Sequence, residues 1–212
     1  MEPLSTTKPH PIPNEDSMPS TPTTLTPNTS TANAYLRPQP GESAPNYDHY
    51  VSLVPGNDVL AALEDQRRQT LLLLSGRTEA DGDLRYAPDK WSLKEVLGHL
   101  NDTERIMAYR ALRIARGDQT PIEGFEQDDY VRNSPFAHRP LADLIEDYIA
   151  VRRATISLFR NLDEAAWTRR GIANKNEVTV RALAYIIAGH ELHHRKILEE
   201  KYLKQVTSEG RR

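Results

Sequence analysis

Three histidines and a glutamate lie within five consecutive positions of residues 188–194 (AGHELHH). His190 and His194 are four residues apart, so on a helix they share one face, with Cβ atoms about 5–6 Å apart. This is the spacing with which one helix offers two imidazoles to one metal ion. Both histidines fall in an apolar stripe of that helix, where unpaired imidazoles are costly to bury. The pattern therefore indicates a metal site with two ligands from this helix.

The same residues match the zinc-peptidase signature H-E-x-x-H, in which the glutamate acts as general base. The extended signature requires a glycine at position 197 and a histidine at position 200, where this chain has Ile197 and Glu200. Only eighteen residues follow His194, so a later helix is poorly placed to add a carboxylate ligand. The peptidase interpretation is therefore disfavoured, and Glu191 is a candidate base whose alternative is a solvated side chain.

A third ligand is expected upstream, and His99 is the best candidate. Ser92 and Glu95 form a capping box, which predicts a helix that begins at Leu93 and carries His99 in its second turn. His99 lies at the edge of an apolar stripe, so the alternative is a core-edge histidine hydrogen-bonded to a neighbouring helix. The remaining upstream histidines fall in a proline-rich tail, beside it or in a loop: His10, His49 and His138.

Three neutral imidazoles that leave a coordination position open are typical of a catalytic metal ion rather than a structural one. Such an ion keeps its positive charge and favours the ionisation of a bound water or thiol. Glu104 lies in the apolar stripe of the same helix as His99 and is a candidate to orient a ligand imidazole. The alternative for Glu104 is a buried pair with an arginine such as Arg110 or Arg152.

The composition limits the classes of function. The chain of 212 residues has a formal net charge of −3 and no basic excess, which argues against a nucleic-acid partner. Cysteine is absent, so disulfides, thiolate ligands and a cysteine nucleophile are excluded. With no secretory signal and no apolar run of membrane-spanning length, we expect a cytoplasmic protein that acts on a small molecule without a membrane partner. Four arginines of the second helix are interpreted as surface charge: Arg105, Arg110, Arg113 and Arg116.

The pattern of apolar residues predicts an all-α domain with a tail at each end. Residues 1–46 contain ten of the fifteen prolines among Thr, Ser and Asn, and are predicted to be disordered. Residues 205–212 form a polar C-terminal tail. Residues 47–204 are predicted to form a four-helix bundle, a fold that builds metal sites from facing helices. The helices are expected at about 57–74, 93–116, 140–162 and 180–203, and no convincing strand is found. The polar segment 118–139, with the loop 124–130 (GFEQDDY), is long for a bundle connection. Such loops are often functional lids, and the alternative is an ordinary solvated surface.

Residues 90–100 (KWSLKEVLGHL) and 187–194 (IAGHELHH) together resemble the DinB/YfiT-like family of metalloenzymes, over about residues 49–204. The resemblance implies a four-helix bundle with a divalent ion on three histidines, which correspond here to His99, His190 and His194, and a homodimer. It also implies metal-dependent hydrolase or thiol S-transferase chemistry, with a bacillithiol-, mycothiol- or glutathione-type cosubstrate. Zinc and nickel are the expected metals, with manganese and iron as further options. The alternative is a bundle that binds a metal or small ligand without catalysis, since no unequivocal base is present.

Overall fold

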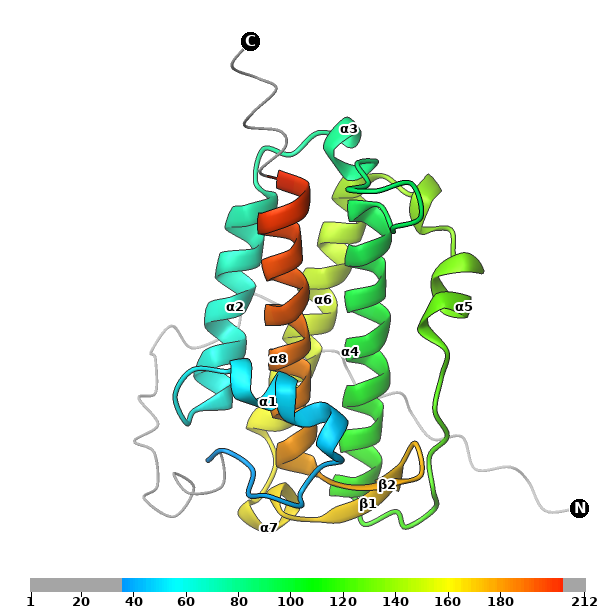
Figure 1. Ribbon diagram of the computed structural model, residues 1–212. Helices are drawn as coiled ribbons and strands as arrows, with labels where there is room; N and C mark the ends of the chain where they lie inside the picture. Colours follow the sequence, from blue (N-terminus) through cyan, green and yellow to red (C-terminus); the bar gives the residue numbers. More distant parts are fainter. Residues whose placement is uncertain (1–35, 204–212) are drawn as a thin grey trace, which may run out of the picture.

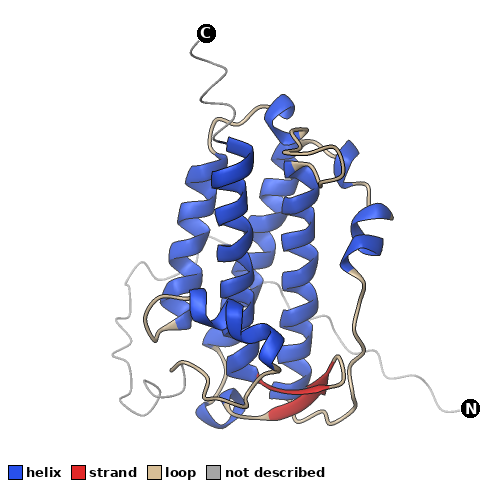
Figure 2. Ribbon diagram, in the orientation of Figure 1, coloured by secondary structure: helices blue, strands red, loops and turns tan. Residues whose placement is uncertain are grey.

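The computed structural model describes residues 36–203. Four long helices pack side by side as a bundle (Figures 1 and 2): α2 (Val59–Leu74), α4 (Leu93–Ala115), α6 (Leu141–Arg160) and α8 (Val180–Ile197). Helices α2 and α4 each contact both α6 and α8, and α8 continues as a π-helical segment, η5 (Leu198–Leu203). The predicted four-helix bundle is confirmed. Within residues 36–203, no helix is long and apolar enough to cross a membrane.

The two helices that carry the candidate ligands begin at side-chain caps. The Glu95 amide donates to Ser92 Oγ at 3.2 Å, and the Ser92 amide donates to the Glu95 carboxylate at 2.6 Å. At the start of α8, the Ala182 amide donates to Thr179 Oγ1 at 3.1 Å. These caps satisfy amides that have no partner inside the helix, and so fix the residue at which each helix begins.

The interior of the bundle consists of two apolar clusters with a polar layer between them. One cluster gathers around Phe159 and Trp167, and the other around Leu93 and Leu144. Between them the four helices bury polar side chains at similar heights: Gln66, Thr70, His99, Thr103, Glu104, Arg152, His190 and Glu191. Buried polar groups are costly unless they are paired, so this layer is where a functional site is expected.

Shorter elements surround the bundle. They are η3 (Pro45–Tyr47), α1 (Asp48–Leu53), α3 (Glu79–Gly82), α5 (Gln127–Arg132), η4 (Phe136–His138), α7 (Glu164–Trp167), β1 (Arg170–Ala173) and β2 (Asn176–Thr179). Helix α1 lies across the side of α8, and α5 lies beside α4 (Figure 1). The expectation that the chain contains no strand is wrong, because β1 and β2 form an antiparallel hairpin. Its strands have four residues each, too few for a visible alternation of apolar residues. Asn174 and Lys175 form the turn with φ of 48° and 64°, the left-handed conformation of a tight hairpin turn.

Part of the segment expected to be disordered packs against the bundle. Arg37 donates to the backbone oxygen of Val51 at 2.6 Å. Glu42 is buried and accepts hydrogen bonds from Thr179 Oγ1 at 2.9 Å and from Arg181 Nε at 2.6 Å. Residues 36–46 are therefore anchored by a few specific polar contacts, which composition alone does not reveal. Residues 1–35 and the predicted tail 205–212 lie outside the described residues.

Replacing Glu42 by glutamine is expected to lower the free energy of unfolding by about 1–3 kcal/mol at pH 7, because Arg181 loses its charged partner. Burial raises the pKa of Glu42, but the hydrogen bonds from Arg181 and Thr179 outweigh burial and the pKa is lowered overall. Since the folded pKa lies below the unfolded value, the contribution is complete above about pH 4.3 and is lost as pH falls through the folded pKa.

Urea unfolding of the wild type and Glu42→Gln between pH 7 and pH 3 measures this contribution. The difference between the two proteins should shrink below about pH 4. Glu177→Gln is the matched control, because Glu177 is an exposed partner of Arg170. Equal effects of the two substitutions at pH 7 would contradict the anchoring role of Glu42.

Helix α1 crosses α8 at a glycine. A Cβ atom at Gly189 would overlap the backbone carbonyl of Tyr50, so only glycine allows this close approach. The crossing brings the Tyr50 ring to 5.5 Å from the His190 ring, in an edge-to-face arrangement. His49 also lies in α1, next to Tyr50. The N-terminal segment therefore forms one wall of the region around His190.

Candidate metal site

The three histidines singled out in the sequence converge inside the bundle. His99 projects from α4, and His190 and His194 project from α8. The Nε2 atoms of His99 and His190 are 3.1 Å apart, and one ring nitrogen from each histidine lies within 4.8 Å of the other two. The ring centroid of His194 is 4.9 Å from that of His99 and 4.6 Å from that of His190. Within residues 36–203, this is the one cluster of potential metal ligands.

The chemistry of these side chains fits a divalent cation. Burial lowers the pKa of His99 to about 4 and that of His194 to about 3, with the neighbouring imidazoles adding to the shift at His194. Burial and the same neighbours also lower the pKa of His190. All three rings are therefore neutral at pH 7, as metal ligation requires. Tetrahedral ligands at about 2.0–2.1 Å from one ion lie about 3.3 Å from each other, close to the observed separation of His99 and His190.

The orientation of His99 is set by its neighbours. Its Nδ1 is 3.4 Å from Thr103 Oγ1, one turn further along α4, and Trp91 packs on the ring with a centroid distance of 4.8 Å. When Nδ1 donates to the threonine hydroxyl, Nε2 keeps its lone pair and faces His190. The tryptophan in the motif of residues 90–100 thus supports the ring that would bind the metal.

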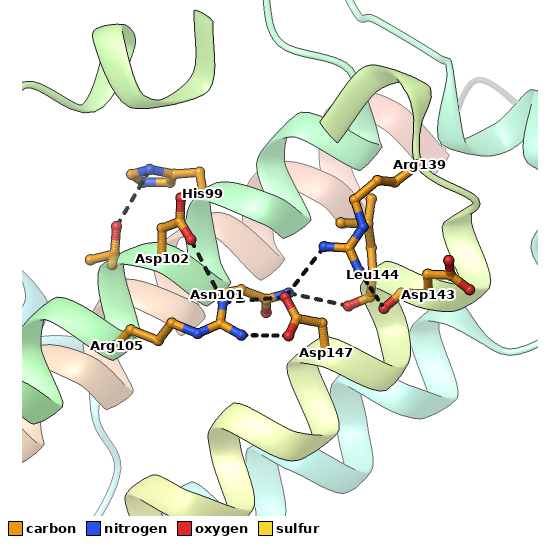
Figure 3. A network of polar contacts seen from close by, with 9 residues as sticks. His99, Asn101, Asp102, Arg105, Arg139, Asp143, Leu144 and Asp147 are labelled. Atoms are coloured by element: carbon orange, nitrogen blue, oxygen red, sulfur yellow. Dashed lines mark hydrogen bonds and ion pairs between the residues drawn. The ribbon is translucent and has the colours of Figure 1, made fainter. Parts of the chain in front are cut away.

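Helix α4 is held to α6 by a polar network beside the site (Figure 3). Asn101 Nδ2 donates to the Leu144 carbonyl at 3.2 Å and to Asp147 at 3.3 Å. Arg105 contacts the same carboxylate with both terminal nitrogens. Figure 3 shows the His99 ring pointing away from this network. The network therefore fixes the position of α4 without using the imidazole.

Cavities open on two sides of the histidines. The larger has a volume of about 290 Å³, and its wall combines α1, α4, α8, the loop before α5 and the hairpin turn. It is lined by Tyr47, Tyr50, His99, Thr103, Met107, Arg110, Phe125, Glu126, Gln127, Asn174, Ile186 and His190. The second, of about 250 Å³, is lined by Tyr86, Asp89, Lys90, Trp91, Val96, Asp128, His194, Ile197 and Tyr202. The long segment 118–139, interpreted as a candidate lid, contributes to both cavities.

The two candidate acids meet in a buried ion network. Both carboxylates contact Arg152, which donates to Glu104 at 2.9 and 2.7 Å and to Glu191 at 2.6 Å. The other oxygen of Glu191 accepts from Thr70 Oγ1 and from the Tyr148 hydroxyl, each at 2.6 Å. Glu104 thus has the arginine partner that was its alternative interpretation. Glu191 is buried rather than solvated, and it does not line the larger cavity.

The remaining histidines of the described chain lie outside the cluster. His193 faces the outer side of α8, where its ring centroid is 5.5 Å from that of His49. His138 ends the short helix η4 and is exposed. His10 lies outside the described residues.

The expectation that Arg110 is a surface charge is wrong, because Arg110 is 2% exposed and lines the larger cavity. The signal was present in the spacing, because Arg110 is three residues after Met107 and four before Ile114, both buried in α4. The contribution of Tyr50 was also missed, because α1 reaches the site only through tertiary packing.

Comparison with known proteins identifies the family. The DinB superfamily matches residues 62–198, more than half of the chain, and this protein therefore belongs to the DinB superfamily. Among solved structures it is similar to YfiT from Bacillus subtilis, reported as "a probable metal-dependent hydrolase with an unusual four-helix bundle topology". That likeness has a TM-score of 0.58 at 15% identity and covers 76% of this chain and 91% of YfiT. A search of curated proteins found no match.

Proposed function

We propose that this protein is a metal-dependent enzyme of the DinB superfamily, which hydrolyses a small electrophilic substrate or transfers a low-molecular-weight thiol to it. The observation that carries the proposal is the convergence of three neutral imidazoles between two cavities. His99, His190 and His194 would hold the ion, with zinc or nickel the expected metals. A divalent ion bound there would act as a Lewis acid and lower the pKa of a water or thiol.

The side chains around the ion would bind and orient the reactants. Tyr50 and Phe125 give the larger cavity aromatic walls, and the Glu126 carboxylate lines it as the acidic group able to accept a proton. In hydrolysis, the water oxygen forms a bond to the electrophilic atom, the bond to the leaving group breaks, and the proton of the water passes to Glu126 or solvent. In transfer, the thiol sulfur forms the bond to the electrophilic atom, the leaving group departs with its bonding electrons, and the thiol proton passes to Glu126 or solvent. The presence of two cavities gives room for both a thiol and its acceptor.

The second candidate function is metal or small-ligand binding without catalysis. One observation favours it: the buried contacts of Glu191 with Arg152, Thr70 and Tyr148 occupy the carboxylate that the sequence suggested as a base. Under this alternative the metal site would be retained without turnover. The metal content of the purified protein therefore does not separate the two functions, whereas a rate does.

The proposal is tested on full-length protein purified without a tag. Plasma mass spectrometry should find about one equivalent of zinc or nickel per chain. The protein is then assayed for conjugation of 1-chloro-2,4-dinitrobenzene with glutathione or cysteine, and for hydrolysis of 4-nitrophenyl acetate. Metal-dependent turnover that is lost in His99→Ala supports the enzyme. Bound metal with no rate above that of His99→Ala in any assay favours the binding protein.

The assembly and the location of the protein stay predictions. The homodimer rests on the family resemblance, and light scattering at micromolar concentration tests it. A small-molecule substrate is proposed because the two cavities are small, each below about 300 Å³.

A further inference from the structure

One arginine in the larger cavity has no acidic partner. Arg110 is 2% exposed, and no carboxylate in the described part of the chain lies within ion-pairing distance of it. Its partners are neutral: the Glu123 carbonyl at 2.8 Å, the Met107 sulfur at 3.5 Å and the Tyr47 hydroxyl. The buried Nε–H has no acceptor. A buried guanidinium in this state is costly unless a ligand completes its contacts.

Arg152 is a second buried arginine, and it has the acidic partners that Arg110 lacks among the described residues. Both arginines are almost fully buried, and burial by itself acts to lower the pKa of each guanidinium. At Arg152 the carboxylates of Glu104 and Glu191 outweigh burial, and the pKa is raised well above its usual value. At Arg110 the pKa stays lowered, because only tyrosine hydroxyls oppose burial. Within residues 36–203, no acidic side chain balances the charge of Arg110.

Arg110 lies in the wall of the same cavity as two of the candidate metal ligands, His99 and His190. The guanidinium lies 5.9 Å from the centroid of the Phe125 ring, and Phe125 lines the same cavity as His99 and His190. The one carboxylate of that lining, Glu126, is exposed and forms no ion pair with Arg110. Among the described residues that line this cavity, Arg110 is the one arginine or lysine, so it supplies the fixed positive charge of the cavity wall.

We infer that Arg110 binds the carboxylate of a small, partly aromatic or aliphatic substrate, whose reactive end faces His99 and His190. This assignment rests on the proposed function for the identity of the cavity as a substrate site. A carboxylate accepts parallel hydrogen bonds from a guanidinium, as Nε–H and a neighbouring N–H offer them. The cavity of about 290 Å³ and its walls Tyr50, Phe125 and Met107 suit a compact apolar body behind that group.

The test compares phenylacetate with its neutral isostere phenylacetamide, by calorimetric titration of the full-length protein in zinc-loaded and chelator-treated forms. The chelator-treated form is decisive, because zinc itself attracts carboxylates. We expect the wild type to bind phenylacetate at least about tenfold more tightly than phenylacetamide in that form. Arg110→Met should abolish the preference. Arg113→Met, which removes a charge one turn away that pairs with Asp118, should keep it.

Circular dichroism and thermal unfolding check that each variant is folded. Should Arg110→Met unfold, Arg110→Lys takes its place. It should weaken phenylacetate binding at least about fivefold while leaving phenylacetamide unchanged, because an ammonium lacks the planar pair of donors. Equal binding of the two probes to the wild type overturns the inference. An equal preference in the Arg110 and Arg113 variants overturns it as well.

Metal content is measured on the same samples, so that failure of the proposed metal site can be distinguished from failure of the proposed carboxylate site. A preference for phenylacetate that depends on Arg110, in a protein that binds no zinc, supports the carboxylate site and removes the metal site. Zinc binding through the three histidines without any such preference supports the metal site and removes the carboxylate site.

Discussion

Replacement of His99, His190 or His194 by alanine is expected to lower the affinity for a divalent metal by more than about 100-fold. Loss of a hydrogen-bond partner behind a ligand typically costs about 10–100-fold, and loss of the ligand itself costs more. The three nitrogens come from two helices and lie within 4.8 Å of one another, so no two of them retain the site. Competition against a chromogenic zinc chelator measures the affinity of each variant.

His138→Ala and His193→Ala are the matched controls and should keep their metal. His138 is exposed and lies outside the cluster, whereas His193 is the nearest imidazole outside the cluster among the described residues, 5.2 Å from His194 between ring centroids. In the wild type, chelation should lower the melting temperature, because an ion bound only by the folded state adds to its stability. If His193→Ala loses as much metal as His99→Ala, the ligand set is wrong.

The helices and the candidate ligands could be predicted because their signals are local. The capping box of Ser92 and Glu95 fixes the start of α4, and with it the height of His99 in the bundle. The four-residue spacing of His190 and His194 fixes their common face. Both are properties of one helix, which the sequence encodes within a few residues.

The walls of the site could not be predicted, because they depend on contacts between distant segments. Tyr50 reaches His190 only because Gly189 leaves room for the α1 backbone. A glycine in a helix does not indicate which segment of the chain packs against it. The hairpin turn at Asn174 reaches the larger cavity through strands too short to recognise. The burial of Arg110 could not be predicted for a different reason. An arginine is expected to be exposed, and its position in an apolar stripe of a helix does not by itself show that it is buried.

Replacement of Arg152 by methionine is expected to lower the free energy of unfolding by about 3–5 kcal/mol at pH 7, the typical effect of removing one partner from a buried ion pair. Arg152 is 1% exposed and contacts the carboxylates of both Glu104 and Glu191. Without it, two buried acids face each other with no cation. Urea unfolding followed by circular dichroism measures the loss, and Arg153→Met, on the exposed side of the same helix, is the control.

Removal of the two acids as well identifies the cause of the loss. In Arg152→Met, the buried carboxylates of Glu104 and Glu191 lie together without a cation, and leaving buried charges uncompensated opposes folding. Adding Glu104→Gln and Glu191→Gln to Arg152→Met should therefore restore part of the stability at pH 7. No restoration would indicate lost packing volume instead, and would mean that the charges of this layer do not hold α4, α6 and α8 around the histidines.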